Sequence, residues 1–257
     1  MFFTTFAISL LSAVSTVNSQ TVYLAGDSTM APSSGVIQGW GTAIGQYLSI
    51  PVVNKAVGGE SSRSYSDNGR FTDIINSVKS GDFVIIEFGH NDPHADPDNG
   101  KQTAVGDGYD ITANVTTASG TTILIHSFAF YIENAINSIQ AKGAIPIISS
   151  LTPHNTFTNG QIGFDGGRFQ TYAQSIGTRK NIVYIDHYSY TVQAFNALGQ
   201  STVATFFPTD ALHFNAAGAK VVAQAFVRGL LCSNSALKSK VNSAGQSVPS
   251  EIYHFRC

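Results

Sequence analysis

Charge is scarce in this chain of 257 residues, of which only 12% are charged, and the net charge is −2 at pH 7. Without a basic patch, the chain lacks the electrostatic footprint of a nucleic-acid-binding protein. Long apolar runs are also missing, because polar residues interrupt every hydrophobic stretch before it could cross a bilayer. We therefore expect neither a nucleic-acid partner nor a membrane span.

The N-terminus contains no Lys or Arg, yet residues 1–19 otherwise resemble a secretory signal peptide. Val17 and Ser19 are small enough to permit cleavage before Gln20. A buried first strand is the alternative, but a better strand begins at Thr21. We therefore expect a secreted, extracellular protein whose mature chain, 20–257, forms one domain and is a monomer.

Cysteine is rare as well, with only Cys232 and Cys257 near the C-terminus. In an oxidising compartment the two would pair and hold the tail, 233–257, against the last helix. A loop of that size would stabilise the fold by about 3 kcal/mol, whereas two free thiols are the alternative. Asn114 lies in an Asn-Val-Thr triplet, which is an acceptor for N-glycosylation in secreted proteins.

Apolar runs rich in β-branched residues alternate with segments of helical periodicity. The runs at 22–25, 52–56, 83–88, 146–150 and 182–185 predict strands, and helices are expected at 40–48, 71–78, 122–141, 164–176 and 216–231. Strands that are apolar throughout are buried on both faces, which indicates a parallel sheet between helices. We expect an α/β fold, a flavodoxin-like three-layer α/β/α sandwich with a central five-stranded parallel sheet. Residues 93–120 predict a long surface loop.

Polar, glycine-rich segments follow the first three predicted strands, and another precedes the last helix. They are Gly26-Asp27-Ser28, Gly58-Gly59, Gly89-His90-Asn91-Asp92 and Asp210-Ala211-Leu212-His213. Each alone could be a helix cap or a turn. If the strand order is 2-1-3-4-5, however, the first three converge beyond the carboxyl ends of adjacent strands, where such sheets bind ligands.

The residues in these segments suit hydrolysis of an acyl ester. A serine such as Ser28 becomes nucleophilic when a base takes its proton, and His213 can be that base. Asp210 can orient the imidazole, while the N–H groups of Ser28 and Gly59 and the amide of Asn91 can stabilise an oxyanion. The chain has no Gly-x-Ser-x-Gly elbow, which argues against an ordinary α/β-hydrolase.

In this order the four segments resemble the conserved blocks of the SGNH (GDSL-type) hydrolase superfamily, and the chain is most similar to its fungal rhamnogalacturonan acetylesterases. The segments that carry the closer similarity are 22–30, 54–59, 87–92, 186–190 and 207–210. The resemblance implies an SGNH fold without metal or cofactor, Ser28 as nucleophile, and Asp210 and His213 as its partners. It also implies Ser28, Gly59 and Asn91 as oxyanion donors, and the acetylated rhamnogalacturonan of plant cell-wall pectin as substrate.

The chain departs from these relatives at Glu60, where they have a basic residue, and residues 93–120 lack the cysteines that some of them carry. A carboxylate beside the cleft should disfavour a polyanionic substrate. Arg63 and Arg70 could contact galacturonate carboxylates, but we expect them to form ordinary ion pairs. A secreted lipase or phospholipase with the same residues, another acetylesterase and a non-catalytic carbohydrate-binding protein remain the alternatives.

Overall fold

A parallel five-stranded sheet forms the centre of the protein in the computed structural model, which describes residues 19–33, 35–250 and 252. Its strands are β1 (Val22–Gly26), β2 (Val52–Asn54), β3 (Phe83–Glu87), β6 (Ile145–Ser149) and β7 (Val183–Ile185). Their order is β2-β1-β3-β6-β7, with every neighbouring pair parallel. This confirms the expected fold class and places the first strand between the second and third. The predicted signal peptide lies outside the described residues, apart from Ser19.

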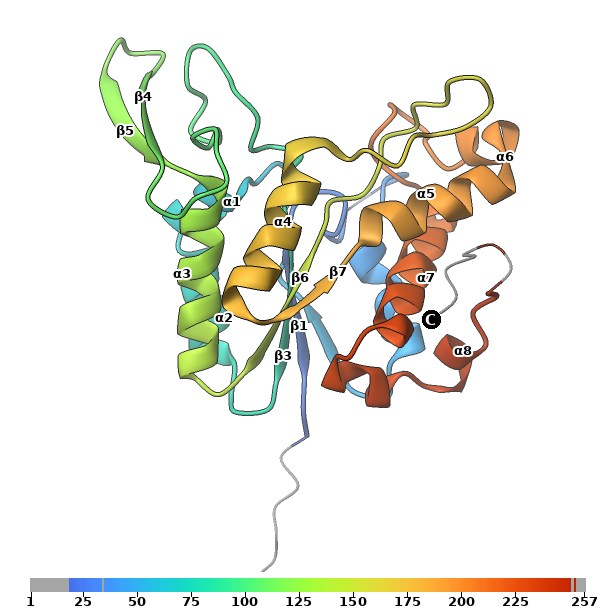
Figure 1. The fold of residues 1–257 in the computed structure, drawn as a ribbon. Coiled ribbons are helices and arrows are strands. Elements are labelled where there is room, and N and C mark those ends of the chain that lie inside the picture. Colours follow the sequence, from blue (N-terminus) through green and yellow to red (C-terminus); the bar gives the residue numbers. More distant parts are fainter. Residues whose placement is uncertain (1–18, 34, 251, 253–257) are drawn as a thin grey trace, which may run out of the picture.

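Helices cover both faces of the sheet (Figure 1). One layer contains α1 (Ser62–Asp67), α2 (Arg70–Ser77), α3 (Phe128–Ala141) and α4 (Gly167–Lys180). The other contains η1 (Trp40–Thr42), η2 (Ile44–Tyr47), α5 (His187–Leu198) and α7 (Ala216–Cys232), with α6 (Gln200–Ala204) beside α5. The result is the predicted α/β/α sandwich.

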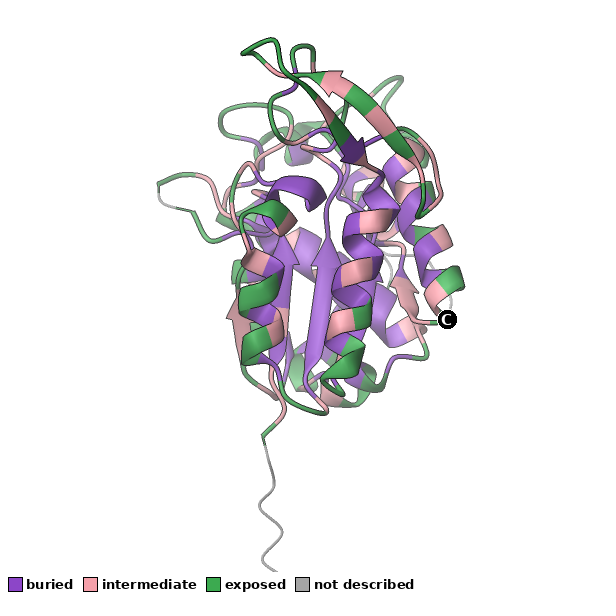
Figure 2. Ribbon diagram, turned by 90° about the vertical axis from the view of Figure 1, so that its left-hand side faces the viewer, coloured by how far each residue is buried: buried purple, intermediate pink, exposed green. Residues whose placement is uncertain are grey.

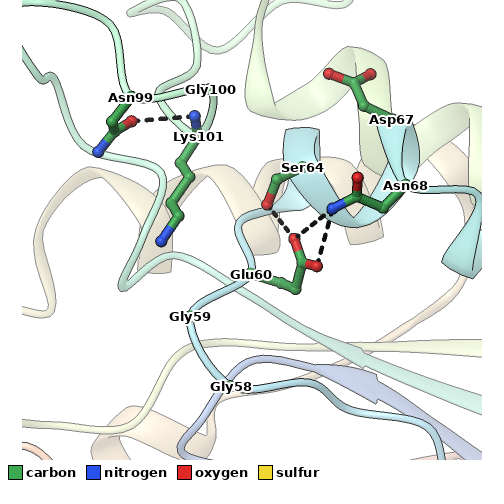
Figure 3. A pocket seen from close by; sticks show the side chains of 9 residues that line it. All are labelled: Gly58, Gly59, Glu60, Ser64, Asp67, Asn68, Asn99, Gly100 and Lys101. Atoms are coloured by element: carbon green, nitrogen blue, oxygen red, sulfur yellow. Dashed lines mark hydrogen bonds between the residues drawn. The ribbon is translucent and has the colours of Figure 1, made fainter.

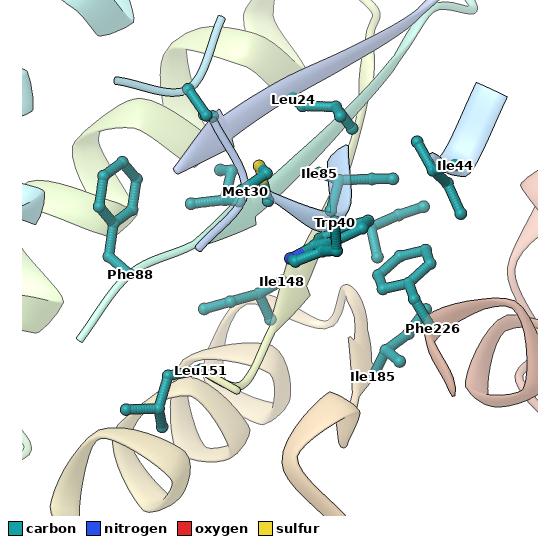
Figure 4. Close-up of a cluster of buried hydrophobic side chains, with 14 of the residues drawn as sticks. Leu24, Met30, Trp40, Ile44, Ile85, Phe88, Ile148, Leu151, Ile185 and Phe226 are labelled. Carbon is teal, nitrogen blue, oxygen red and sulfur yellow. The ribbon is translucent and has the colours of Figure 1, made fainter. Parts of the chain in front are cut away.

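The hydrophobic core lies on both sides of the central strands, which Figure 2 shows as buried. Every residue of β3 is buried: the apolar run 83–86, as expected for a strand covered on both faces, and Glu87 at its end. On the α7 side, the rings of Trp40 and Phe226 stack with centroids 5.0 Å apart, beside Ile85 and Ile148 (Figure 4). Burial of this apolar surface stabilises the sheet whose carboxyl ends carry the site.

The segment 93–120 was predicted to be a long surface loop, which is correct for 93–111 but wrong for Thr112–Thr116, and the prediction that the next helix begins at Thr122 was wrong. Residues Thr112–Thr116 form β4 and Thr122–His126 form β5, an antiparallel hairpin at the upper edge of Figure 1. Exposure alternates from one residue to the next along Thr122–His126, which is the period of a β-strand. The β-branched residues of this segment also favour a strand. The helix starts only after Ser127, whose hydroxyl caps it by accepting from the Phe130 N–H.

Other predicted helices differ from the observed ones by smaller amounts. The predicted helix 40–48 consists of the two 3-10 turns η1 and η2, and the helix predicted at 164–176 is α4, which starts at Gly167. Four α-helices were missed: α1, capped by Ser61, α5, capped by Asp186, and the short helices Gln200–Ala204 and Ser243–Gln246. Asn114 is exposed on β4, and its glycosylation stays a prediction.

The tail that follows α7 packs against the body of the protein. It contains η3 (Ala236–Lys240) and α8 (Ser243–Gln246). The N–H of Asn242 donates to the carbonyl oxygen of Tyr47 over 3.0 Å, and Leu48 forms a β-bridge with Val241. The predicted Cys232–Cys257 disulfide involves a residue outside the described part of the chain.

Candidate active site

Ser28, His213 and Asp210 form a continuous hydrogen-bonded chain. The Oγ of Ser28, just beyond β1, is 2.9 Å from Nε2 of His213, and Nδ1 of His213 is 2.7 Å from Oδ2 of Asp210. His213 and Asp210 lie in the loop before α7. With its proton on Nδ1, the imidazole donates to Asp210 and presents Nε2 as an acceptor to the serine hydroxyl. That is the arrangement that a general base for a serine nucleophile needs.

The Asp210 carboxylate is fixed by its own loop. Its Oδ1 accepts hydrogen bonds from the N–H groups of Leu212 and His213, both at 2.8 Å. Partial burial alone would raise the pKa of Asp210, but the hydrogen bonds from His213 and from these N–H groups lower it to about 2. The carboxylate therefore stays ionised near neutral pH and can stabilise an imidazolium on His213.

The turn that carries Ser28 is held by the residues on either side of it. Gly26 has no room for a side chain, because a Cβ there would lie 2.9 Å from the carbonyl oxygen of Glu87. The buried Asp27 accepts from the N–H and the hydroxyl of Thr29, at 2.9 and 2.8 Å. Burial raises the pKa of Asp27 to about 6 despite these bonds. Asp27 therefore fixes the turn, and the Ser28 hydroxyl faces His213.

The loops after β2 and β3 meet the Ser28 turn. A Cβ on Gly58 would lie 3.8 Å from that of Ser28, and Gly59 has a φ of 76°, which favours glycine. Asn91 donates from Nδ2 to the carbonyl oxygen of Glu60 over 3.0 Å, joining the two loops. An amide nitrogen carries two hydrogens, so the second remains available to a ligand. The predicted donors thus lie on connected loops around one crevice.

Glu60 and the two nearby arginines are already paired. Burial would raise the pKa of Glu60, but hydrogen bonds from Ser64, Arg70 and Asn68 hold it below its usual value. Arg70 Nε lies 3.0 Å from Glu60 Oε1. Arg63 is buried and makes a bidentate contact to Asp98 at 3.0 and 3.2 Å. Both arginines form ion pairs, as expected, and Arg70 compensates the Glu60 charge that we expected to repel polyanions.

Two histidines that our sequence analysis did not single out form the other wall of the site. Nε2 of His90 is 3.3 Å from Oγ1 of Thr152, and the rings of His90 and His154 are 5.3 Å apart. Burial and the nearby His154 lower the pKa of His90 to about 3, and burial also lowers that of His154. The lowered pKa values favour the neutral form of both rings. His154 follows β6, so the rule that ligands bind at strand ends could have found it.

A buried polar cluster underlies the site. The Glu87 carboxylate, at the end of β3, accepts from Trp40 Nε1 at 2.8 Å and from Ser149 Oγ at 2.6 Å, and lies 2.7 Å from His187 Nδ1. Nε2 of His187 donates to the carbonyl oxygen of Val222 over 2.8 Å. The cluster thereby connects the central sheet to α7, whose preceding loop carries His213.

Asp92 fixes the loop after β3 to the start of α1. Its Oδ1 accepts from the N–H of Ser62 at 3.0 Å and from the Ser62 hydroxyl, while Oδ2 is buried without a hydrogen-bond partner among the described residues. Burial raises the pKa of Asp92 to about 7.

Within the described ranges, no group of three or more His, Cys, Asp and Glu side chains is placed to hold a metal ion. Nor does any helix there have the length and apolar character to cross a membrane.

A family model described as GDSL-like Lipase/Acylhydrolase matches residues 22–226, a span that contains Ser28, Gly59, Asn91, Asp210 and His213. The chain belongs to this family. As a GDSL-like acylhydrolase it is a serine-type carboxylic ester hydrolase, and the predicted family resemblance is confirmed.

Two curated relatives match this GDSL-like acylhydrolase over most of its length. A rhamnogalacturonan acetylesterase of Emericella nidulans is 43% identical over 232 residues, which cover 90% of this chain and 93% of that protein. A probable rhamnogalacturonan acetylesterase of Bacillus subtilis, YesY, is 25% identical over 218 residues, which cover 81% of this chain and 91% of that protein.

Solved structures share the fold. The YxiM protein of Bacillus subtilis has a TM-score of 0.67 at 24% identity and covers 83% of this chain, which spans 56% of that longer protein. Axe2, an acetylxylan esterase from Geobacillus stearothermophilus, has a TM-score of 0.54 at 16% identity, covering 82% of this chain and 93% of that one.

Proposed function

We propose that this GDSL-like acylhydrolase is a secreted acetylesterase that removes acetyl groups from rhamnogalacturonan by way of an acetyl-enzyme on Ser28. The observation that carries the proposal is the hydrogen-bonded chain from Ser28 Oγ through His213 to Asp210. The acetyl group and the polysaccharide follow from the similarity to the Emericella nidulans acetylesterase. Secretion follows from the signal-peptide character of residues 1–19.

In the first half of the reaction, Ser28 Oγ attacks the carbonyl carbon of the acetyl ester while its proton passes to His213 Nε2. The carbonyl oxygen becomes an oxyanion, which accepts hydrogen bonds from the N–H groups of Ser28 and Gly59 and from Asn91 Nδ2. The carbon–oxygen bond to the sugar then breaks, and His213 returns its proton to the departing sugar hydroxyl. Ser28 is left acetylated.

In the second half, His213 takes a proton from a water molecule, whose oxygen attacks the acetyl carbon. A second oxyanion forms in the same hole and collapses, Ser28 Oγ recovers the proton from His213, and acetate leaves. Asp210 stays ionised throughout, because its low pKa keeps the carboxylate charged beside the imidazolium. His90 and His154, both neutral, add no positive charge that would compete for it.

Acetate release from matched substrates tests the proposal. The panel consists of acetylated rhamnogalacturonan, acetylated xylan, 4-nitrophenyl acetate and a long-chain 4-nitrophenyl ester, each with wild-type enzyme and with Ser28→Ala. We expect the highest kcat/KM on acetylated rhamnogalacturonan and no hydrolysis above background with Ser28→Ala. A preference for the long-chain ester would favour a lipase and contradict the proposal, as would equal rates for the two enzymes.

A further inference from the structure

A pocket of about 350 Å³ opens beside the predicted oxyanion glycine. The loop after β2 forms its floor and α1 one wall, while a turn of the segment between β3 and β4 forms the opposite wall (Figure 3). It is lined by Gly58, Gly59, Glu60, Ser64, Asp67, Asn68, Asn99, Gly100 and Lys101. Since Gly58 adjoins Ser28, a sugar whose acetyl group reaches Ser28 would extend into this pocket.

Lys101 supplies an uncompensated positive charge in the pocket. Its side chain extends from the turn toward Gly59 (Figure 3), and Nζ lies 3.5 Å from the position that a Cβ would occupy on Gly59. The lysine is partly buried. No hydrogen-bond or ion-pair partner of Nζ occurs in the described part of the chain, so the ammonium is free to receive an anion.

The other charges of the pocket are already engaged. The Glu60 carboxylate accepts from Asn68 and Arg70 and, in Figure 3, turns away from Lys101. Asp67 lies 3.5 Å from Arg63 Nε. Asp67 shares Arg63 with the buried Asp98. Among the described residues that line the pocket, Lys101 is the one cationic side chain, and its Nζ has no partner.

The position of Lys101 is set before any ligand arrives. Nη1 of Arg63 donates to Asp98 Oδ1 at 3.0 Å and to the carbonyl oxygen of Gln102 at 3.2 Å, so Arg63 holds the turn on both sides of Lys101. The Lys101 N–H also donates to the side chain of Asn99 over 3.0 Å. Buried bidentate arginine–carboxylate pairs restrict geometry strongly, which reduces the entropy that Lys101 would lose on binding.

We propose that Lys101 and its pocket form a carboxylate subsite, which binds the ionised carboxylate of a uronate sugar next to the acetyl group that Ser28 attacks. This inference rests on the proposed function and names the residue that recognises the acidic polymer. An ammonium attracts carboxylates as a point charge and tolerates several ring orientations.

The test compares acetylated rhamnogalacturonan oligosaccharides that carry free carboxylates with the same oligosaccharides after methyl esterification. The readout is the ratio of kcat/KM for the free acid to kcat/KM for the methyl ester, from acetate release at low ionic strength. We expect Lys101→Met to reduce this ratio about tenfold and Lys101→Arg to preserve most of it. Lys142→Met, an exposed lysine that ends α3, serves as the control and should leave the ratio unchanged. Thermal unfolding checks that each variant is folded.

High salt provides a second readout, because screening weakens attraction between partly exposed charges. As the ionic strength rises, the kcat/KM ratio of the wild-type enzyme should fall toward that of Lys101→Met. A Lys101→Met ratio equal to that of wild type, or equal losses on both substrates, overturns the subsite. If the wild-type enzyme cleaves 4-nitrophenyl acetate but neither oligosaccharide, the proposed substrate fails and the subsite with it. If the wild-type enzyme releases acetate from both oligosaccharides with equal kcat/KM, the Lys101 inference is overturned and the proposed substrate stands.

Discussion

Asn91 is tied to Glu60 through a hydrogen bond from its side-chain Nδ2 to the Glu60 carbonyl oxygen, over 3.0 Å. The bond joins the loop after β3 to the loop after β2 at the residue that follows Gly59. It orients the Asn91 amide before a substrate binds, which is how donors in a preorganised oxyanion hole avoid reorganising during the reaction.

Replacement of this amide should slow the chemical step. We expect Asn91→Ala to reduce kcat by roughly 10²–10³-fold, about 3 kcal/mol of transition-state stabilisation, as for the loss of other oxyanion donors. The measurement is kcat for 4-nitrophenyl acetate, with Asn134→Ala, a residue on α3, as a control that should match wild type. A negligible change in kcat would remove Asn91 from the oxyanion hole.

The buried carboxylate of Glu87 should be important for stability. Glu87→Ala removes the acceptor of the buried donors Trp40 Nε1 and Ser149 Oγ, so we expect it to lower the free energy of unfolding by about 3 kcal/mol. Glu133→Ala is the matched control, because Glu133 pairs with the more exposed Arg179, and its loss should cost about 1 kcal/mol or less. Urea denaturation measures both. Equal losses in the two variants would contradict the role of the buried cluster.

The contribution of Asp92 to stability should fall as the pH rises from about 4 to about 7. Burial raises the pKa of Asp92 from 3.8 to about 7, so in this window the folded chain binds a proton that the unfolded chain has released. The free-energy contribution of Asp92 is therefore present below pH 4 and lost as the pH approaches 7, and Asp27 acts in the same direction. The lowered pKa values of His90 and His154 act in the opposite direction in this window, because the unfolded imidazoles bind protons that the folded ones do not. The lowered pKa of Asp210 affects stability only below about pH 4.

Urea denaturation across this pH range, with wild type and Asp92→Asn, measures the contribution of Asp92. The variant cannot ionise at position 92, while His90 and His154 titrate in both proteins. The free energy of unfolding of wild type minus that of Asp92→Asn should therefore decrease as the pH rises from about 4 to about 7. Slopes that coincide for the two proteins would show that Asp92 does not titrate in this window.

The features that could be predicted from the sequence are those with a regular physical pattern. Apolar runs such as 83–88 indicated strands buried on both faces, and the strand-end rule brought Ser28, Gly59 and Asn91 into one crevice. The pairing of His213 with Asp210, three residues apart, also followed from the sequence. These expectations depended only on periodicity and on the geometry of parallel sheets.

The rest depended on contacts that no local pattern encodes. The run at Thr122–His126 continues into helical periodicity, so only its pairing with β4 distinguishes it as a strand. The pairing of Glu60 with Arg70 and of Arg63 with Asp98 is tertiary. In the sequence, Lys101 is one lysine in a polar segment. Its position beside Gly59 depends on how its turn packs against α1, which these ion pairs determine.

The activity of Ser28→Ala on a simple acetyl ester tests the central claim most directly. Asn91 and Lys101 would modulate the reaction, whereas the account assigns the covalent step to the Ser28 hydroxyl alone. We predict that kcat for 4-nitrophenyl acetate falls by more than about 10⁴-fold, with the fold unchanged by circular dichroism. A Ser28→Ala protein that hydrolyses the ester at the wild-type rate would contradict the account.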